Sequence, residues 1–160
     1  SSGLRSVCVA DESAPSAPSE QDQPPGFDTR LVVILRDDLP TWQKLNATLF
    51  LVSGIAATDP TTVGPPYEDA SGGTYLPMFR QPGLVFAATR DELRRAFDRA
   101  RERDVAMALF PDELFSTRHD EANRAAVRAV SQDDLSLVGI AFRAERKTAN
   151  KIVKGLALHR

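Results

Sequence analysis

The stretch "LVVILRDDLPTWQKLN" at residues 31–46 decides the fold, because a buried strand and a helix follow one another within it. Its first five residues are apolar and three of them are β-branched, as is typical of a strand that is buried on both faces. Arg36-Asp37-Asp38 ends this apolar run. Asp38 is suited to cap the next helix, and Pro40 to its first turn, where a missing N–H costs nothing. The stretch therefore predicts a strand–helix unit with three charged residues at the mouth of the strand.

The helix that follows is strongly apolar. Over residues 42–57, apolar side chains recur at steps of three and four residues, at Trp42, Leu45, Leu49, Val52 and Ala56. Further apolar side chains widen this surface, namely Phe50, Leu51 and Ile55. Such a pattern predicts a helix that is largely buried.

Strand-like and helix-like segments alternate through the rest of the chain. Apolar runs predict buried strands at 84–89, 105–110 and 135–142, in addition to 30–36. Charged, amphipathic segments predict helices at 90–104, 118–131 and 146–158. "YEDASGGTYLPM" (67–78) predicts a hairpin around its Ser-Gly-Gly turn. The expected fold class is α/β, a three-layer α/β/α domain with a mixed, mostly parallel four-stranded sheet and a small inserted hairpin.

For two of the predicted helices, the sequence also indicates which residues pack on the core or cap the first turn. The helix at 90–104 is expected to dock through four apolar residues, Leu93, Ala96, Phe97 and Ala100. The helix at 118–131 is preceded by Thr117, with Asp120 three residues later, which approximates a capping box.

Length and composition favour a soluble, globular protein. The chain has 160 residues, 42% hydrophobic and 26% charged, enough for one domain with an ordinary core. No apolar run approaches the roughly 20 residues that span a bilayer, and the first residues lack the apolar centre of a signal peptide. The single cysteine, Cys8, cannot form an internal disulfide. A cytoplasmic protein without a membrane association is therefore expected.

The first 28 residues differ from the rest. They carry five acidic residues against Arg5, and "DESAPSAPSEQDQPPG" (11–26) is rich in Ser, Pro and Gln. Such a segment has too little apolar surface to offset its ordering entropy. Residues 1–28 are therefore expected to form a disordered acidic tail, and residues 29–160 a single α/β domain.

Polar residues follow two of the predicted strands, where ligands of parallel sheets usually bind. Arg36 and Asp38 end the first strand, and Lys44 lies in the next helix. Asp112 follows the strand at 105–110. Such a group could bind an anion and polarise water, or it could be structural, with Asp38 capping the helix and Arg36 pairing with an acid. Both interpretations remain open.

His119 and Asn123 lie one turn apart at the start of the helix at 118–131, on its apolar side. They point to a site with a proton-transferring group, or to a buried histidine and an amide that brace a loop. The sequence has no Cys–His cluster and no HExxH, GxGxxG, Walker or GxSxG motif, so neither a metal nor a cofactor is expected.

Three lysines of the last predicted helix, Lys147, Lys151 and Lys154, lie within about 60° of each other on a helical wheel. A stripe of this kind could contact phosphates, or it could be an ordinary solvated face.

These motifs resemble those of type II peptidyl-tRNA hydrolases. "VVILRDDL" is similar to the opening of that family, in which a strand ends in Arg-x-Asp-Leu. The segments "RDDLPTWQKLN", "YLPM" and "HDEAN…KIVKGLALH" more closely resemble an uncharacterised bacterial family with that fold. The resemblance covers about residues 30–159, and Arg36, Asp38 and Leu39 match the hydrolase motif. Asp112 falls where the hydrolases have an Asp, whereas "TWQKL" replaces their Gly-Lys-Gly-Lys run.

The resemblance implies the peptidyl-tRNA hydrolase II-like fold and, as a first hypothesis, a metal-independent hydrolase or acyl-transfer enzyme. Its substrate would be an ester or amide, including aminoacyl- or peptidyl-tRNA. The catalytic candidates are Asp38 or Asp112 for activating water, Lys44 for the oxyanion and His119 for proton transfer. The substrate-binding candidates are Arg36, Trp42, Asn123, Lys147, Lys151 and Lys154.

Two other hypotheses remain open. In one, the same cleft belongs to a non-catalytic module that binds RNA or a small anionic molecule. In the other, the domain is a structural partner protein with an apolar cleft. The expected partners are thus tRNA or a small anion, and the oligomeric state, a dimer included, is left open by the sequence.

Overall fold

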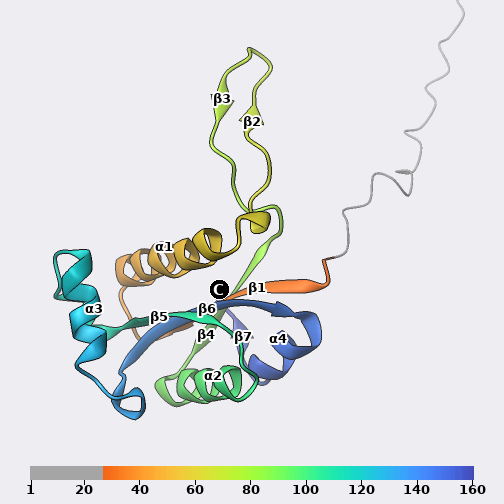
Figure 1. The fold of residues 1–160 in the computed structure, drawn as a ribbon. Helices are drawn as coiled ribbons and strands as arrows, with labels where there is room; N and C mark the ends of the chain where they lie inside the picture. Colours follow the sequence, from red (N-terminus) through yellow and green to blue (C-terminus); the bar gives the residue numbers. More distant parts are fainter. Residues whose placement is uncertain (1–26) are drawn as a thin grey trace, which may run out of the picture.

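The computed structural model describes residues 27–160 (Figure 1). The tail predicted at residues 1–28 therefore lies almost wholly outside the described residues. The domain is a mixed α/β structure built on a five-stranded sheet of strand order β5-β6-β1-β4-β7. These strands are β1 (Thr29–Arg36), β4 (Gly83–Ala88), β5 (Met107–Pro111), β6 (Leu137–Glu145) and β7 (Ala157–Leu158).

The prediction of a mostly parallel, four-stranded sheet is wrong. β1 and β4 pair in parallel, whereas β1–β6, β5–β6 and β4–β7 are antiparallel. Strands that alternate with helices need not be parallel, because a helix in a connection does not have to cross the sheet. Long apolar runs also occur in any central strand that is covered on both faces, as β1 and β6 are here.

Helices cover both faces of the sheet. α1 (Thr41–Thr58) lies on one face, and α2 (Arg90–Glu102) and α4 (Arg146–Ile152) lie on the other (Figure 1). Alternating residues of β1 divide between the two cores, with Leu31, Val33 and Leu35 toward α1 and Val32 and Ile34 toward α2 and α4. This alternation also sends the Arg36 side chain to the α2 side, as it does for Ala88, its register partner on β4.

α1 sits on the sheet through a face that includes Leu51 and Ile55, which were expected only to widen the main apolar stripe. Its buried residues are Ala47, Leu51 and Ile55. The stripe at Trp42, Leu45 and Leu49 points to solvent instead, and Leu49 is 68% exposed where Leu51 is 1% exposed. The helix is thus apolar on both sides, and the expectation that it would be largely buried is wrong.

The start of α1 also differs from the expected one. Its N-cap is Pro40, which has no side chain to accept a hydrogen bond. Asp38 lies in the preceding turn and is paired with Arg36. The expected capping role of Asp38 is therefore wrong, because the N-cap lies two residues later and the Asp38 carboxylate pairs with Arg36.

Close packing of α1 on the sheet depends on Gly139 of β6. A Cβ at this position would lie 2.9 Å from the carbonyl oxygen of Ile34 and 3.1 Å from Cδ1 of Leu51. The pairing of β5 with β6 shifts register nearby, between Phe110 and Pro111. Such an irregularity bends a strand and redirects its side chains.

α2 confirms its prediction closely. Its four buried residues are the expected ones, Leu93, Ala96, Phe97 and Ala100. Thr89 and Glu92 form a capping box at its start.

The predicted helix at 118–131 is shorter, and its cap is a different residue. α3 runs over Asp120–Arg128, follows the 3-10 helix η3 (Asp112–Phe115) and precedes η4 (Gln132–Asp134). His119 is its N-cap, and the Nδ1 atom of His119 accepts a hydrogen bond from the Ala122 N–H. The capping box expected at Thr117 is therefore absent, and no residue of α3 is buried.

The hairpin prediction is confirmed. β2 (Tyr67–Glu68) and β3 (Thr74–Tyr75) form a two-stranded sheet that stands away from the body (Figure 1). Asp69 holds the turn, because its side chain accepts hydrogen bonds from the N–H groups of Ser71 and Gly73 and from the Tyr75 hydroxyl. η2 (Pro60–Thr62) links α1 to this hairpin.

The last predicted helix ends six residues early. α4 stops at Ile152, Gly155 adopts a left-handed φ of 87°, and β7 then adds to the edge of the sheet beside β4. The expected helix at 146–158 is therefore wrong over its second half, because "KGLAL" contains a chain-reversing glycine followed by a strand.

Candidate functional site

The charged group at the mouth of β1 is a closed ion-pair cluster. Arg36, whose side chain is 8% exposed, donates from Nε to Asp38 Oδ1 at 2.6 Å. It also donates from Nη1 to Asp112 Oδ2 at 3.2 Å and from Nη2 to Asp112 Oδ1 at 3.4 Å. A fourth hydrogen bond joins Nη1 to the carbonyl oxygen of Leu137. The guanidinium thus ties β1 to the ends of β5 and β6.

Asp112 has a second partner in this cluster. Its carboxylate accepts a hydrogen bond from the Ser136 hydroxyl, and its backbone N–H donates to the Ser136 carbonyl oxygen. Ser136 was not predicted from the sequence, because no motif surrounds it. Only the pairing of β5 with β6 brings it beside Asp112.

The ion pairs shift the pKa values of two of these groups. Burial lowers the pKa of Arg36, but its hydrogen bonds to Asp38 and Asp112 outweigh this and raise it overall. The hydrogen bond from Arg36 lowers the pKa of Asp38 below its ordinary value. Both shifts favour the charged forms, as expected for an ion pair at the edge of a core.

Lys44 lies outside this cluster. Its Nζ atom is 3.2 Å from Nε2 of His159. Because an ammonium group only donates, Nε2 must accept, and this leaves the proton on Nδ1, which lies 2.7 Å from the Arg160 carbonyl oxygen. His159 escaped the sequence analysis because the tail of β7, which places it beside Val85, was predicted as helix.

A pocket of about 330 Å³ lies between α1 and the segment that leads into α3. Its lining includes the aromatic side chains of Trp42, Phe50, Phe110 and Phe115. Trp42 and Phe115 pack edge to face at 5.9 Å between ring centroids. Polar side chains complete the lining, namely Asn46, Thr117, Arg118, His119, Asp120 and Asn123.

The two polar residues predicted on α3 both line this pocket. Since Nδ1 of His119 accepts the capping hydrogen bond, the neutral ring carries its proton on Nε2, where it can be donated. Asn123 Oδ1 accepts a hydrogen bond from the Thr117 hydroxyl, which leaves the amide NH₂ of Asn123 as a donor. His119 is exposed rather than buried, so the alternative of a buried histidine is wrong.

The sequence-predicted residues therefore fall into separate groups. Arg36, Asp38 and Asp112 form the ion-pair cluster, whose arginine leaves β1 on the α2 side. Trp42, His119 and Asn123 line the pocket on the α1 side. Lys44 pairs with His159 and lines neither the pocket nor the cluster.

The three lysines predicted to bind phosphates lie outside both the ion-pair cluster and this pocket. Lys147 and Lys151 are exposed on α4, while Lys154 follows the end of that helix beside Arg95 and Arg99 of α2. The predicted continuous helical stripe is thus interrupted, because the helix ends before Lys154.

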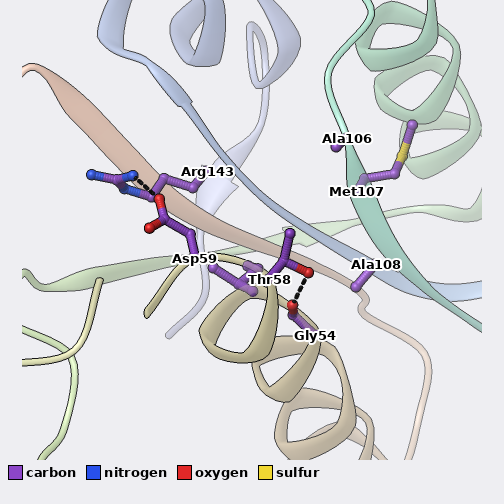
Figure 2. A pocket seen from close by; sticks show the side chains of 8 residues that line it. Gly54, Thr58, Asp59, Ala106, Met107, Ala108 and Arg143 are labelled. Atoms are coloured by element: carbon purple, nitrogen blue, oxygen red, sulfur yellow. Dashed lines mark hydrogen bonds and ion pairs between the residues drawn. The ribbon is translucent and has the colours of Figure 1, made fainter. Parts of the chain in front are cut away.

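A second pocket, of about 260 Å³, lies between the end of α1 and β5 (Figure 2). Its floor is made by Ala106, Met107 and Ala108. At its rim, Arg143 of β6 donates from Nη1 to Asp59 Oδ2 at 2.7 Å, and the Thr58 hydroxyl donates to the Gly54 carbonyl oxygen. No sequence motif pointed to it, because its residues come from three elements.

Two kinds of feature are absent from residues 27–160. Within them, no group of three or more His, Cys, Asp or Glu side chains lies close enough together to hold a metal ion. None of the helices in this part of the chain combines the length and apolar character needed to cross a lipid bilayer.

Residues 29–160 match the family described as "protein of unknown function (DUF2000)". The chain belongs to the DUF2000 family. This DUF2000 domain is also similar to a solved structure, that of the protein of unknown function Atu0240 from Agrobacterium tumefaciens strain C58. The two share 47% sequence identity and superpose with a TM-score of 0.82, over 84% of this chain and 100% of the other. No curated protein sequence matches the chain.

Membership in DUF2000 agrees with the resemblance of "RDDLPTWQKLN", "YLPM" and "HDEAN…KIVKGLALH" to an uncharacterised family. The quoted segments hold five of the pocket residues, Trp42, Asn46, His119, Asp120 and Asn123. They also hold Arg36 and Asp38 of the ion-pair cluster.

Proposed function

We propose that this DUF2000 domain binds a small molecule with a planar ring and an anionic or carbonyl group, in the pocket between α1 and α3. The observation that carries the proposal is the meeting of Trp42 with His119 and Asn123. These residues are almost eighty positions apart in the chain, and the pocket brings an aromatic ring together with hydrogen-bond donors.

The chemistry of the lining defines the ligand class. The rings of Trp42, Phe50 and Phe115 offer faces and edges on which a planar group can stack. The Arg118 guanidinium and the free donors of His119 and Asn123 suit an oxygen-rich substituent on that ring. A volume of about 330 Å³ is at the lower end of the range for small-molecule pockets.

The intrinsic fluorescence of Trp42 offers a direct test, because it is the only tryptophan of the chain. Aromatic carboxylates and nucleoside monophosphates are titrated into the full chain while tryptophan emission is recorded. We expect saturable quenching by at least one of these compounds. Asn123→Ala should weaken that binding about tenfold, as expected for the loss of a good hydrogen bond.

Arg128→Ala is the matched control, since Arg128 ends the same helix but does not line the pocket. It should leave the affinity unchanged. The proposal is wrong if no compound in the panel quenches the tryptophan saturably, or if Asn123→Ala and Arg128→Ala behave alike.

A second candidate function is hydrolysis of an ester or amide in the manner of type II peptidyl-tRNA hydrolases, together with their fold. Its support is the ion-pair cluster, in which Arg36 and Asp38 belong to the Arg-x-Asp-Leu motif. The Asp112 side chain is 35% exposed and is oriented by Arg36 and Ser136, so one of its oxygens could position water. The separate position of Lys44 makes this the weaker candidate.

The hydrolase candidate is tested by incubating the pure protein with peptidyl-tRNA and measuring release of the peptide. Turnover that falls at least about 100-fold in Asp112→Asn, but is kept in Asp133→Asn, would support it. Asp133 is an exposed control carboxylate on η4. Absence of turnover in the wild type excludes this candidate and leaves the small-molecule proposal untouched.

A further inference from the structure

The outer face of α1 is apolar, and within residues 27–160 other elements touch it only at its edge, where Trp42 contacts Phe115 and Phe50 contacts Phe110. Four large side chains on this side of the helix, Trp42, Leu45, Leu49 and Phe50, are between 52% and 68% exposed. Leu45 and Leu49 lie opposite the face at Ala47, Leu51 and Ile55 that packs on the sheet, whereas Phe50 lies on the flank of that face, beside Phe110. A surface helix of a monomer normally places polar side chains on its outer side.

Charge is almost absent from this helix. Among the 18 residues of α1, the single charged one is Lys44, and its ammonium group is occupied by His159. By contrast, α2 has a charged outer face and buries only its apolar stripe. The composition of α1 is therefore that of a helix packed on both sides.

The hairpin extends the same side of the molecule. β2 and β3 rise from the C-terminal end of α1 and stand clear of the body (Figure 1). Their segment exposes four more large side chains, Tyr67, Tyr75, Leu76 and Met78, and Leu76 is 86% exposed. We refer to these four residues and the four on α1 as the outer apolar surface.

We propose that the outer apolar surface is the interface of a symmetric homodimer, in which α1 packs antiparallel against α1 of a second copy. The two-fold axis then passes near Leu49, close to the middle of the helix. Such an interface is self-complementary, because each copy presents the same patch to the other.

The size of the surface suits a stable dimer. Eight large side chains that are 49% to 86% exposed provide on the order of 1,000 Å² of apolar surface, at roughly 150–250 Å² for each fully exposed aromatic ring. A standard interface buries about 800 Å² per partner. An exposed patch of this size is unusual in a monomer.

Charge complementarity favours a second copy over an unrelated partner. α1 is roughly 27 Å long, and the hairpin rises from its C-terminal end. In the antiparallel arrangement, the hairpin of one copy therefore reaches the N-terminal end of α1 in the other. The hairpin carries Glu68 and Asp69, and Arg118 lies beside Trp42 at that end of α1.

The oligomeric state of the full chain tests this proposal. Light scattering coupled to size exclusion, over the micromolar range, should give twice the 17.5 kDa mass of one chain. Leu49→Arg should give a monomer with an unchanged far-UV circular dichroism spectrum, because it places a charge at the centre of the interface. Leu158→Arg is the matched control, since Leu158 is an exposed leucine on β7 and should leave the dimer intact.

A cysteine placed on the two-fold axis tests the arrangement even if Leu49→Arg fails to fold. In a Cys8→Ser background, Leu49→Cys should form a disulfide between two copies on mild oxidation, whereas Leu158→Cys should not. A wild-type monomer, or equal cross-linking of the two variants, would overturn the proposal. The dimer does not rest on the proposed ligand, although Trp42 and Phe50 belong both to the pocket and to the outer apolar surface.

Discussion

Arg36 donates from Nε to Asp38 Oδ1 at 2.6 Å, so two of the three charged residues at the mouth of β1 form an ion pair. The same guanidinium reaches Asp112, 76 residues away, and the Leu137 carbonyl oxygen. What looks in the sequence like a helix cap is thus part of a clamp that joins β1, β5 and β6. The clamp holds the ends of three strands together beside the bulged pairing of β5 with β6.

Arg36→Met should destabilise the domain by about 1–3 kcal/mol, because it leaves Asp112 and Asp38 without a cation. This is less than the roughly 3–5 kcal/mol of a fully buried pair, since both carboxylates are partly exposed. Urea unfolding gives the free energy of unfolding. Arg124→Met, which breaks the exposed pair with Asp120, is the control and should cost less than about 0.5 kcal/mol. Equal losses in the two variants would contradict the clamp.

The Arg36–Asp38 pair should make the free energy of unfolding depend on pH in the acid range. The pKa of Asp38 is lowered in the folded protein by its hydrogen bond from Arg36. Its contribution is therefore complete above the unfolded pKa of about 3.9 and is lost as pH falls through the lower folded value. Urea unfolding from pH 7 down to strongly acidic pH should show a shallower acid loss for Asp38→Asn than for the wild type. Identical pH slopes for the two proteins would show that the pair does not contribute.

Gly139→Ala should destabilise the domain by about 1–3 kcal/mol, because its Cβ would lie 2.9 Å from the Ile34 carbonyl oxygen of β1 and 3.1 Å from Cδ1 of Leu51, which packs α1 on the sheet. Gly83→Ala is the control within a strand, since a Cβ there would meet only Cδ2 of Leu31, at an ordinary 3.8 Å. Thermal and urea unfolding of the two variants measure the difference. A Gly139→Ala protein as stable as Gly83→Ala would mean that α1 can move away without loss.

Tyr75 should titrate at higher pH than an ordinary tyrosine. Its hydroxyl donates to Asp69, and this hydrogen bond raises the pKa of Tyr75 while the same bond lowers that of Asp69. Ultraviolet difference titration follows the two tyrosines of the chain. Asp69→Asn should bring the pKa of Tyr75 back toward about 10, and Tyr75→Phe identifies its part of the curve. An unchanged titration in Asp69→Asn would show that the turn does not hold this contact in solution.

Local patterns were sufficient for much of the secondary structure. The apolar run at 31–35 gave a buried strand, α2 buries all four residues expected from its period, and the Ser-Gly-Gly turn sits in a hairpin. These features depend on neighbours within a few positions in the chain, so the sequence contains them directly.

The candidate site could be predicted only in part. His119 and Asn123 stood out because polar side chains interrupt an apolar helix face, and the pocket does bring them to Trp42. Ser136 and His159 carried no signal, because their partners Asp112 and Lys44 lie 24 and 115 residues away. The second pocket, at Asp59 and Arg143, could not be predicted either, because its residues are also far apart in the sequence.

By itself the sequence determined most of the strands and helices, though not β7, and which side chains are unusual, because hydrophobic periodicity and turn residues act locally. The tertiary structure decided strand direction, the face that α1 presents to the sheet, and the partners of Arg36 and Lys44. Because α1 is apolar on both sides, its hydrophobic pattern alone does not decide which side packs on the sheet. The close approach at Gly139 selects the narrow face at Ala47 and Leu51, and leaves Leu49 in solvent.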